Sequence, residues 1–225
     1  MSETTTPTGL GVLERRVFAA ILFDMDGTLI DSTPAVERSW LTWAAEFGIE
    51  LTGFGAWHGV PAAQVIPKLL PQDQWETAGR RIVEIEVADV EGILVLPGAA
   101  DALAAIPAGR AAIVTSCVRP LAAARIEATG LKPPAVIVTA DQVPVGKPDP
   151  APFLLAAQLL GVDPADCLVI EDAPAGLTAA KAAGAARLAV STTHPADRLE
   201  ADAVIGDLSM IRFTVTSGGI QIGLA

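Results

Sequence analysis

The sequence predicts an α/β protein with a Rossmann-like parallel sheet and a small inserted α-helical domain. Short apolar runs rich in strand-forming residues recur along the 225-residue chain and alternate with segments of helical periodicity. Strands and helices that alternate in this way form parallel sheets with helices on both faces. Residues 35–96 interrupt the alternation, because they contain helical segments and no convincing buried strand. Since this stretch follows the first strand directly, we expect it to be an insertion into the α/β body.

Six apolar runs are predicted as the strands of the sheet, at residues 17–23, 110–116, 135–140, 167–172, 186–190 and 203–205. Three helices between the later strands are expected at 119–129, 150–160 and 174–183. Each of these helices is followed by a glycine, which favours a helix end. Residues 211–225 are predicted to form a small hairpin with its turn at Ser217-Gly218-Gly219.

The insertion is predicted to be helical at 34–47, 61–70 and 73–91. Trp40, Trp43 and Phe47 recur at helical spacing and are expected to pack in a core. Pro97-Gly98 marks the end of the insertion. These signals divide the chain into a flexible N-terminal tail (1–16), an α/β core (17–34 and 97–225) and a helical cap domain (35–96).

The composition limits the class of protein. Hydrophobic residues make up 51% of the chain and charged residues 18%, which is typical of a globular protein. The net charge of −11 argues against nucleic-acid binding, although a local pocket can still attract a small anion. No apolar run reaches the roughly 20 residues that span a bilayer, and the N-terminus lacks the pattern of a secretory signal. A cytoplasmic protein without a nucleic-acid or membrane partner is therefore expected. The sequence does not indicate an oligomeric state, and a monomer is the default expectation.

Polar residues follow four of the predicted strands, at the edge where open parallel sheets bind their ligands. They are Asp24, Asp26 and Gly27 after the first strand, Thr115 and Ser116 after the second, Lys147 in the loop after the third, and Glu171 and Asp172 after the fourth. Acids, hydroxyls and one lysine at a single edge predict a site for Mg²⁺ and phosphate.

Asp24 and Asp26 are two residues apart, so in an extended backbone both side chains point to the same side. Two neighbouring carboxylates repel each other unless a cation lies between them or one of them takes a proton. This allows one ionised nucleophile and one partner that carries a proton. Gly27 permits a tight turn and a close approach of backbone N–H groups to phosphate.

Four segments, FDMDGTLIDS, VTS, GKPDP and VIEDAPAG, occur in this order at successive strand ends. Together they resemble the motifs of the haloacid dehalogenase superfamily, and the resemblance covers residues 17–208. It implies a core of the same fold and an enzyme that hydrolyses a small phosphorylated substrate with Mg²⁺.

The resemblance also implies a role for each motif residue. Asp24 would attack phosphorus and form an aspartyl-phosphate. Asp26 would protonate the leaving oxygen and later take a proton from water. Mg²⁺ would be held by the Asp24 side chain, the Asp26 backbone carbonyl and Asp172, with Glu171 close by or bound through water. The phosphoryl group would be contacted by Met25, Gly27, Thr115, Ser116 and Lys147.

The helical insertion resembles the cap of the branch that contains sugar phosphatases, 2-deoxyglucose-6-phosphatase, glycerol-3-phosphatases and β-phosphoglucomutase. Asp26 argues against dehalogenation, because the dehalogenases lack that second aspartate. The mutase is the alternative, but Val36 stands where the mutase has a histidine. A non-catalytic phosphate binder is a second alternative. His58-Gly59 in the insertion is a candidate for substrate recognition, and Arg38 and Lys68 could reach a polar substrate or lie on the surface.

Overall fold

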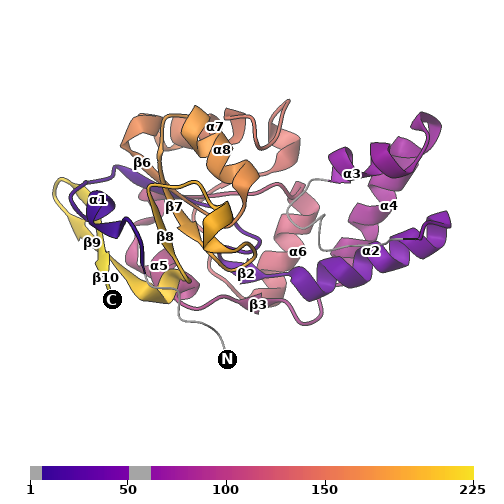
Figure 1. The fold of residues 1–225 in the computed structure, drawn as a ribbon, viewed down its shortest axis with the longest axis horizontal. Coiled ribbons are helices and arrows are strands. Elements are labelled where there is room, and N and C mark those ends of the chain that lie inside the picture. The colour runs from indigo at the N-terminus through magenta and orange to yellow at the C-terminus, as the bar shows by residue number, and fades with distance from the viewer. Residues whose placement is uncertain (1–6, 51–61) are drawn as a thin grey trace.

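The computed structural model describes residues 7–50 and 62–225. Within them, six parallel strands form one sheet in the order β5-β4-β1-β6-β7-β8 (Figure 1). Each predicted strand contains an observed one. The strands are β1 (Ala20–Phe23), β4 (Ala111–Val114), β5 (Val136–Val138), β6 (Cys167–Glu171), β7 (Ala186–Val190) and β8 (Ala203–Ile205). The predicted α/β fold with a helical insertion is confirmed.

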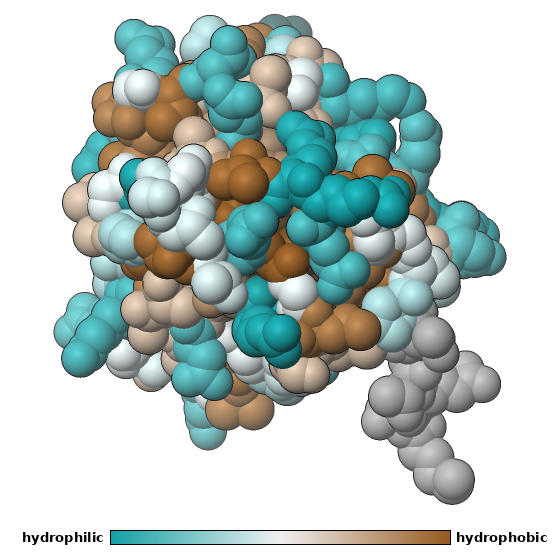
Figure 2. Space-filling view, turned by 90° about the vertical axis from the view of Figure 1, so that its left-hand side faces the viewer, coloured by the Kyte–Doolittle hydropathy of each residue, from teal (hydrophilic) through white to brown (hydrophobic). Residues whose placement is uncertain are grey.

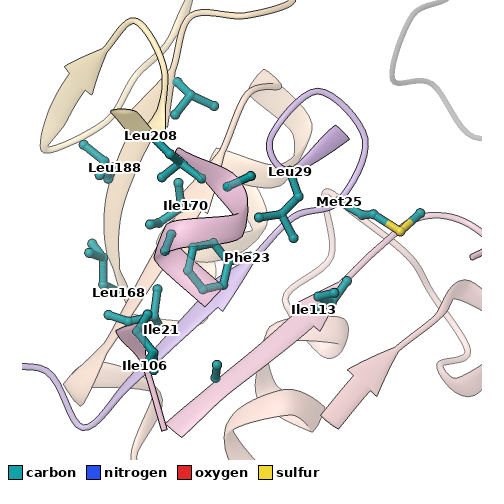
Figure 3. Close-up of a cluster of buried hydrophobic side chains, with 14 of the residues drawn as sticks. Ile21, Phe23, Met25, Leu29, Ile106, Ile113, Leu168, Ile170, Leu188 and Leu208 are labelled. Atoms are coloured by element: carbon teal, nitrogen blue, oxygen red, sulfur yellow. The ribbon is translucent and has the colours of Figure 1, made fainter. Parts of the chain in front are cut away.

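The central strand, β1, is buried on both faces. Ile21 and Phe23 point into one hydrophobic cluster and Ala20 and Leu22 into another, as the two-residue period of a strand requires (Figure 3). Helices α5 (Ala99–Ala105) and α6 (Arg119–Thr129) pack on the face of Phe23. Helices α7 (Ala151–Leu160) and α8 (Pro174–Ala182) cover the opposite face. The sheet is therefore enclosed by helices, and its carboxyl edge carries the polar loops.

The predicted strand 17–23 is too long at its N-terminal end. The observed strand begins at Ala20, because Phe18 pairs instead with Ile220 of the C-terminal hairpin through two backbone hydrogen bonds of 2.8 Å. That hairpin consists of β9 (Ile211–Thr216) and β10 (Gly219–Leu224), as predicted. It lies beside the core, and Phe213 contacts Phe23 edge to face at 6.2 Å between ring centres.

The predicted flexible tail is wrong for residues 7–16, and residues 1–6 lie outside the described part. Residues Leu10–Glu14 form the short helix α1, whose Leu10 and Leu13 are buried in the main core. Thr8 exchanges two backbone hydrogen bonds of 3.0 Å with Val204. Since β8 is the last strand of the sheet, Thr8 pairs with an edge that would otherwise be open.

Three helices of the insertion, here called the cap helices, stand to one side of the sheet (Figure 1). They are α2 (Thr33–Phe47), α3 (Ala62–Leu69) and α4 (Trp75–Ala88). Trp40 and Trp43 pack with Ile66 and Ile82 in a hydrophobic cluster separate from that of the sheet. The Trp43 indole N–H donates to the Ala78 carbonyl at 2.9 Å, which ties α2 to α4.

The chain enters and leaves the cap helices through a short antiparallel pair, β2 (Ile30–Asp31) and β3 (Leu94–Val95).

The end of the molecule that carries α1, β9 and β10 has a mixed surface, with hydrophobic side chains scattered among hydrophilic ones (Figure 2). In the described part of the chain, no helix is both long and apolar enough to cross a bilayer.

Candidate active site

A pocket of about 480 Å³ joins the polar edge of the sheet to the cap helices. Its lining includes four of the predicted site residues: Asp26, Gly27, Ser116 and Asp172. Most of the rest comes from the cap helices and from α6, and the loops after β4, β5 and β7 contribute the others together with Ser32 before α2. The strand-end loops and the insertion therefore meet at one cavity.

Lys147 lies at the centre of the polar edge and is 4% exposed. Its Nζ donates to Asp24 Oδ1 at 2.6 Å, to Glu171 Oε1 at 2.7 Å and to the Val114 carbonyl at 2.8 Å. Burial alone would lower the pKa of Lys147, but Asp24 and Glu171 raise it above its usual value. The lysine is therefore a fixed positive charge that joins the ends of three strands.

Three acids surround this single ammonium group. Ligand oxygens of Asp24, Glu171 and Asp172 lie within 4.8 Å of one another, and all three residues are buried. Burial, followed by the nearby Glu171 and Asp26, raises the pKa of Asp24 to about 7 despite the opposing effect of Lys147. Burial, followed by the nearby Glu171 and Asp24, raises the pKa of Asp172 as well. The cluster thus carries more negative charge than Lys147 balances, and a divalent cation fits its donor set.

The three acids are not equally available to a cation. One oxygen of Glu171 accepts from Lys147, and the other accepts from the Ala173 N–H at 2.8 Å. Lys147 occupies one oxygen of Asp24, and no donor in the described residues contacts the other. Asp172 accepts from two hydroxyl groups, at Oδ1 from Thr28 at 3.5 Å and at Oδ2 from Thr193. Because hydroxyl groups can rotate away, Asp24 and Asp172 are more available to a cation than Glu171.

Gly27 contributes through its missing side chain. Its φ of +86° lies in the left-handed region, and a Cβ atom here would overlap the Asp172 carboxylate. Its N–H donates to the Ile30 carbonyl at 2.7 Å, and its carbonyl accepts from the Thr192 hydroxyl. The Gly27 N–H is thus bonded inside the loop, and the predicted role of Gly27 in phosphate binding stays a prediction.

Three other predicted phosphate contacts differ in their surroundings. Thr115 is buried after β4, and its Oγ1 accepts from the Cys117 N–H at 3.0 Å. Ser116 lines the pocket. The Met25 side chain points into the hydrophobic core, so only its backbone N–H could contact a phosphate (Figure 3).

Asp26 has neighbours that the strand-end pattern does not include. Its Oδ1 accepts from the Ser32 hydroxyl at 2.7 Å and from Arg125 Nη1 at 2.8 Å, while its Oδ2 accepts from Cys117 Sγ at 3.1 Å. Arg125 also donates through Nη2 to Glu86 Oε1 at 3.0 Å. One guanidinium therefore connects the first loop with cap helix α4.

Arg125 and Glu86, the two partners of the contact between α6 and α4, are both buried. Burial opposes the charge of Arg125, but Asp26 and Glu86 outweigh it and raise the pKa of the guanidinium. Burial raises the pKa of Glu86, whereas Arg125 lowers it. A sequence signal for the pair exists: Arg125 shares the inward face of its helix with Leu121 and Ala122. A charged residue at an apolar position of an amphipathic helix indicates a buried partner.

The remaining candidates lie elsewhere. His58 and Gly59 fall outside the described residues, so their predicted recognition role stays a prediction. Arg38 binds the Asp89 carboxylate with contacts of 2.7 and 2.9 Å and the Glu91 carbonyl at 2.6 Å, at the base of the cap helices. Lys68 lies in the last turn of α3 and is absent from the described lining of the pocket.

Gly176 offers a test of how tightly the acid cluster is packed. A Cβ atom at this position in α8 would overlap the Glu171 carboxyl group. Gly176→Ala is therefore expected to lower the free energy of unfolding by about 1–3 kcal/mol, as overpacked sites do, and to reduce activity. Urea unfolding measures the first effect. Gly109→Ala is the matched control, because nothing lies within 4 Å of its added Cβ; equal midpoints for the two variants would contradict the packing described.

Residues 18–184 match the family of haloacid dehalogenase-like hydrolases. The chain belongs to this family. The resemblance carried by the four segments is thereby confirmed, and the match includes every motif residue of the acid cluster. The chain is a phosphoric monoester hydrolase, as its curated relatives are.

Two curated relatives and one solved structure illustrate the similarity. Hexitol phosphatase A of Escherichia coli (strain K12) is 42% identical over 210 residues, which cover 88% of this chain and 95% of the relative. Glycerol-1-phosphate phosphohydrolase 2 of Saccharomyces cerevisiae is 35% identical and covers 89% of this chain and 83% of the relative. The crystal structure of CbbY from Rhodobacter sphaeroides with phosphate aligns with a TM-score of 0.75 at 25% identity, covering 85% of this chain and 95% of that one.

Proposed function

We propose that this haloacid dehalogenase-like hydrolase is a Mg²⁺-dependent phosphatase of sugar or polyol phosphates that works through an aspartyl-phosphate on Asp24. The observation that carries the proposal is the buried cluster of Asp24, Glu171 and Asp172 around the single ammonium of Lys147. A buried nucleophile beside a fixed positive charge suits a substrate that brings its own negative charge.

In the first step, one oxygen of Asp24 attacks phosphorus and the bond between phosphorus and the ester oxygen breaks. Lys147 holds the other oxygen of Asp24 at 2.6 Å and so orients the attacking one. Asp26 supplies a proton to the departing alkoxide, which leaves as the alcohol. Ser116 lies in the pocket lining, where its hydroxyl can donate to a phosphoryl oxygen.

In the second step, water attacks the phosphorus of the aspartyl-phosphate. Asp26 takes a proton from that water, the bond between Asp24 and phosphorus breaks, and inorganic phosphate leaves. Asp26 is suited to both steps because it lies two residues from Asp24 and its residue lines the pocket. The enzyme ends each cycle as it began, with Asp24 as a free carboxylate and Asp26 protonated.

A bound divalent cation would be held by the Asp24 and Asp172 side chains and the Asp26 carbonyl, with Glu171 through water. It would neutralise charge on the phosphoryl oxygens and on the acids. Mg²⁺ prefers such carboxylate and carbonyl oxygens.

The names of the relatives support a hydroxylated substrate: they are phosphatases of hexitol and glycerol phosphates. The pocket has room for a molecule of that size. Val36, in place of the mutase histidine, lines the pocket and supports water rather than a sugar phosphate as the second acceptor. A monomeric, cytoplasmic enzyme stays a prediction.

A phosphate-release screen tests the proposed function. The purified protein is assayed with hexitol phosphates, glycerol 1-phosphate, hexose phosphates and p-nitrophenyl phosphate, with Mg²⁺ or with EDTA. We expect release from polyol or sugar phosphates in Mg²⁺ and none in EDTA. A folded protein that releases no phosphate from any of them would favour the non-catalytic binder, and isomerised sugar phosphate without release would favour the mutase.

Mg²⁺ is also expected to stabilise the fold, independently of turnover. A cation that offsets the surplus charge of the cluster binds the native state only, so at ten times its Kd it should raise the Tm by about 3–6 °C. Differential scanning fluorimetry at constant ionic strength measures the shift. Asp172→Ala should abolish it, whereas Glu127→Gln, which removes an exposed acid of α6, should retain it. An equal shift in both variants would place the cation elsewhere.

A further inference from the structure

The side of the pocket formed by the cap helices is mainly apolar but carries one charged side chain. The cap helices line it with apolar side chains such as Val36, Trp40, Ile66 and Trp75. Among the described lining residues, the only charged side chain from the cap helices is Glu86 of α4. A carboxylate is costly to bury in an apolar wall unless it is paired, and Glu86 is paired with Arg125. The pair keeps a charged acceptor on an otherwise apolar wall, which indicates a specific use for it.

Glu86 is held in one orientation. It is 9% exposed, and its Oε1 accepts from Arg125 Nη2 at 3.0 Å. Arg125 is itself fixed by Asp26 Oδ1 at 2.8 Å and by Cys117 Sγ at 3.1 Å. The second oxygen of Glu86 has no hydrogen-bond donor in the described part of the chain. The pocket therefore contains a pre-oriented carboxylate whose second oxygen can accept a hydrogen bond from a ligand.

The position of this acceptor relates it to the reacting end of the substrate. A single guanidinium separates Glu86 from Asp26, the proposed proton donor to the ester oxygen. The carbon chain that follows the ester oxygen must extend from Asp26 into the pocket, where Glu86 lies. A hydroxyl on this chain can donate to Glu86, while its CH groups contact the apolar wall.

We propose that Glu86, positioned by Arg125, is a specificity-determining residue that accepts a hydrogen bond from a substrate hydroxyl and so selects phosphate esters of hydroxylated carbon chains. This inference rests on the proposed phosphatase function and deepens it. An ester without the hydroxyl would leave the buried Glu86 oxygen unpaired, and sites of that kind reject such analogues strongly.

The test compares glycerol 1-phosphate with propyl phosphate, which has the same three-carbon chain but no hydroxyl. The readout is the ratio of kcat/KM for the two substrates in Mg²⁺. The wild-type enzyme should prefer glycerol 1-phosphate by about 10- to 100-fold, the value of a hydrogen bond to a charged group. Glu86→Met, which keeps the length of the side chain but not its acceptor, should reduce this ratio about 10-fold or more. The loss should fall mainly on glycerol 1-phosphate.

Val83→Ala is the matched control, because Val83 lines the same pocket one turn earlier on α4 and its side chain cannot accept a hydrogen bond. It should change both kcat/KM values by the same factor. If Glu86→Met does not fold, Glu86→Gln carries the test and should reduce the ratio at least about 3-fold, since a neutral amide is the weaker acceptor.

Two results would overturn the inference: a wild-type enzyme that does not distinguish the two esters, or a folded Glu86 variant with an unchanged ratio. Both leave the phosphatase assignment intact, since that depends on Mg²⁺-dependent phosphate release by the wild-type protein. Loss of all release from the wild-type protein would instead contradict the proposed function itself.

Discussion

Asp24→Asn is expected to lower kcat for phosphate release at least about 10⁴-fold, a loss of the size seen when a nucleophile is removed. An amide nitrogen or oxygen cannot replace the attacking carboxylate, and no described acid other than Asp24 lies against Lys147 with a free oxygen. The measurement is release of phosphate from the best substrate of the screen, at saturating Mg²⁺. Mass spectrometry of the quenched enzyme should show a phosphoryl adduct in the wild-type protein only.

The stability of this variant is the control. Asn has the size of Asp, and it removes a buried acid whose pKa is raised to about 7 by burial and by neighbouring acids. In the absence of Mg²⁺ the Tm of Asp24→Asn should therefore equal or exceed that of the wild-type protein, as replaced active-site charges often allow. Substantial Mg²⁺-dependent turnover by a well-folded Asp24→Asn protein would contradict the nucleophile assignment.

Lys147→Met is expected to reduce both activity and stability. The substitution removes the ammonium that contacts Asp24 at 2.6 Å and Glu171 at 2.7 Å, and leaves those buried carboxylates without a counter-charge. Breaking a buried ion pair in this way costs about 3–5 kcal/mol in free energy of unfolding. Chemical denaturation measures the loss, and Mg²⁺ should recover part of it because the cation neutralises the same acids.

Lys181 provides the comparison for Lys147. It pairs with Glu200 at 2.5 Å, but the side chains are 60% and 80% exposed. Surface pairs of this kind contribute little, since water already solvates both charges. Lys181→Met should therefore leave the unfolding midpoint nearly unchanged. A similar loss of stability in the two lysine variants would show that burial of the Lys147 cluster is not what makes its ion pairs strong.

The sequence alone determined the strand-helix alternation, the helical insertion and the motif residues at the strand ends. The sequence predicted that four residues lie close together, because the carboxyl ends of parallel strands share one edge of the sheet. They are Asp24, Lys147, Glu171 and Asp172. The insertion was visible because its helices carry their own apolar stripes, including Trp40 and Trp43. These features depend on local periodicity and on motifs that are contiguous in the chain.

Only the tertiary structure decided the contacts between segments that are far apart in sequence. Phe18 pairs with the C-terminal hairpin instead of extending the first strand. Thr8 pairs with the edge strand β8, and Leu13 packs in the core of the sheet. Arg125 and Glu86 lie 39 positions apart in the sequence and form an ion pair, because α6 and α4 pack against each other beside Asp26. The place of Arg125 on the apolar face of its helix indicates a buried partner, but nothing nearby in the sequence identifies that partner as Glu86. The specificity that we propose for the pocket therefore depends on packing, whereas the grouping of its acids and Lys147 follows from the order of the strands.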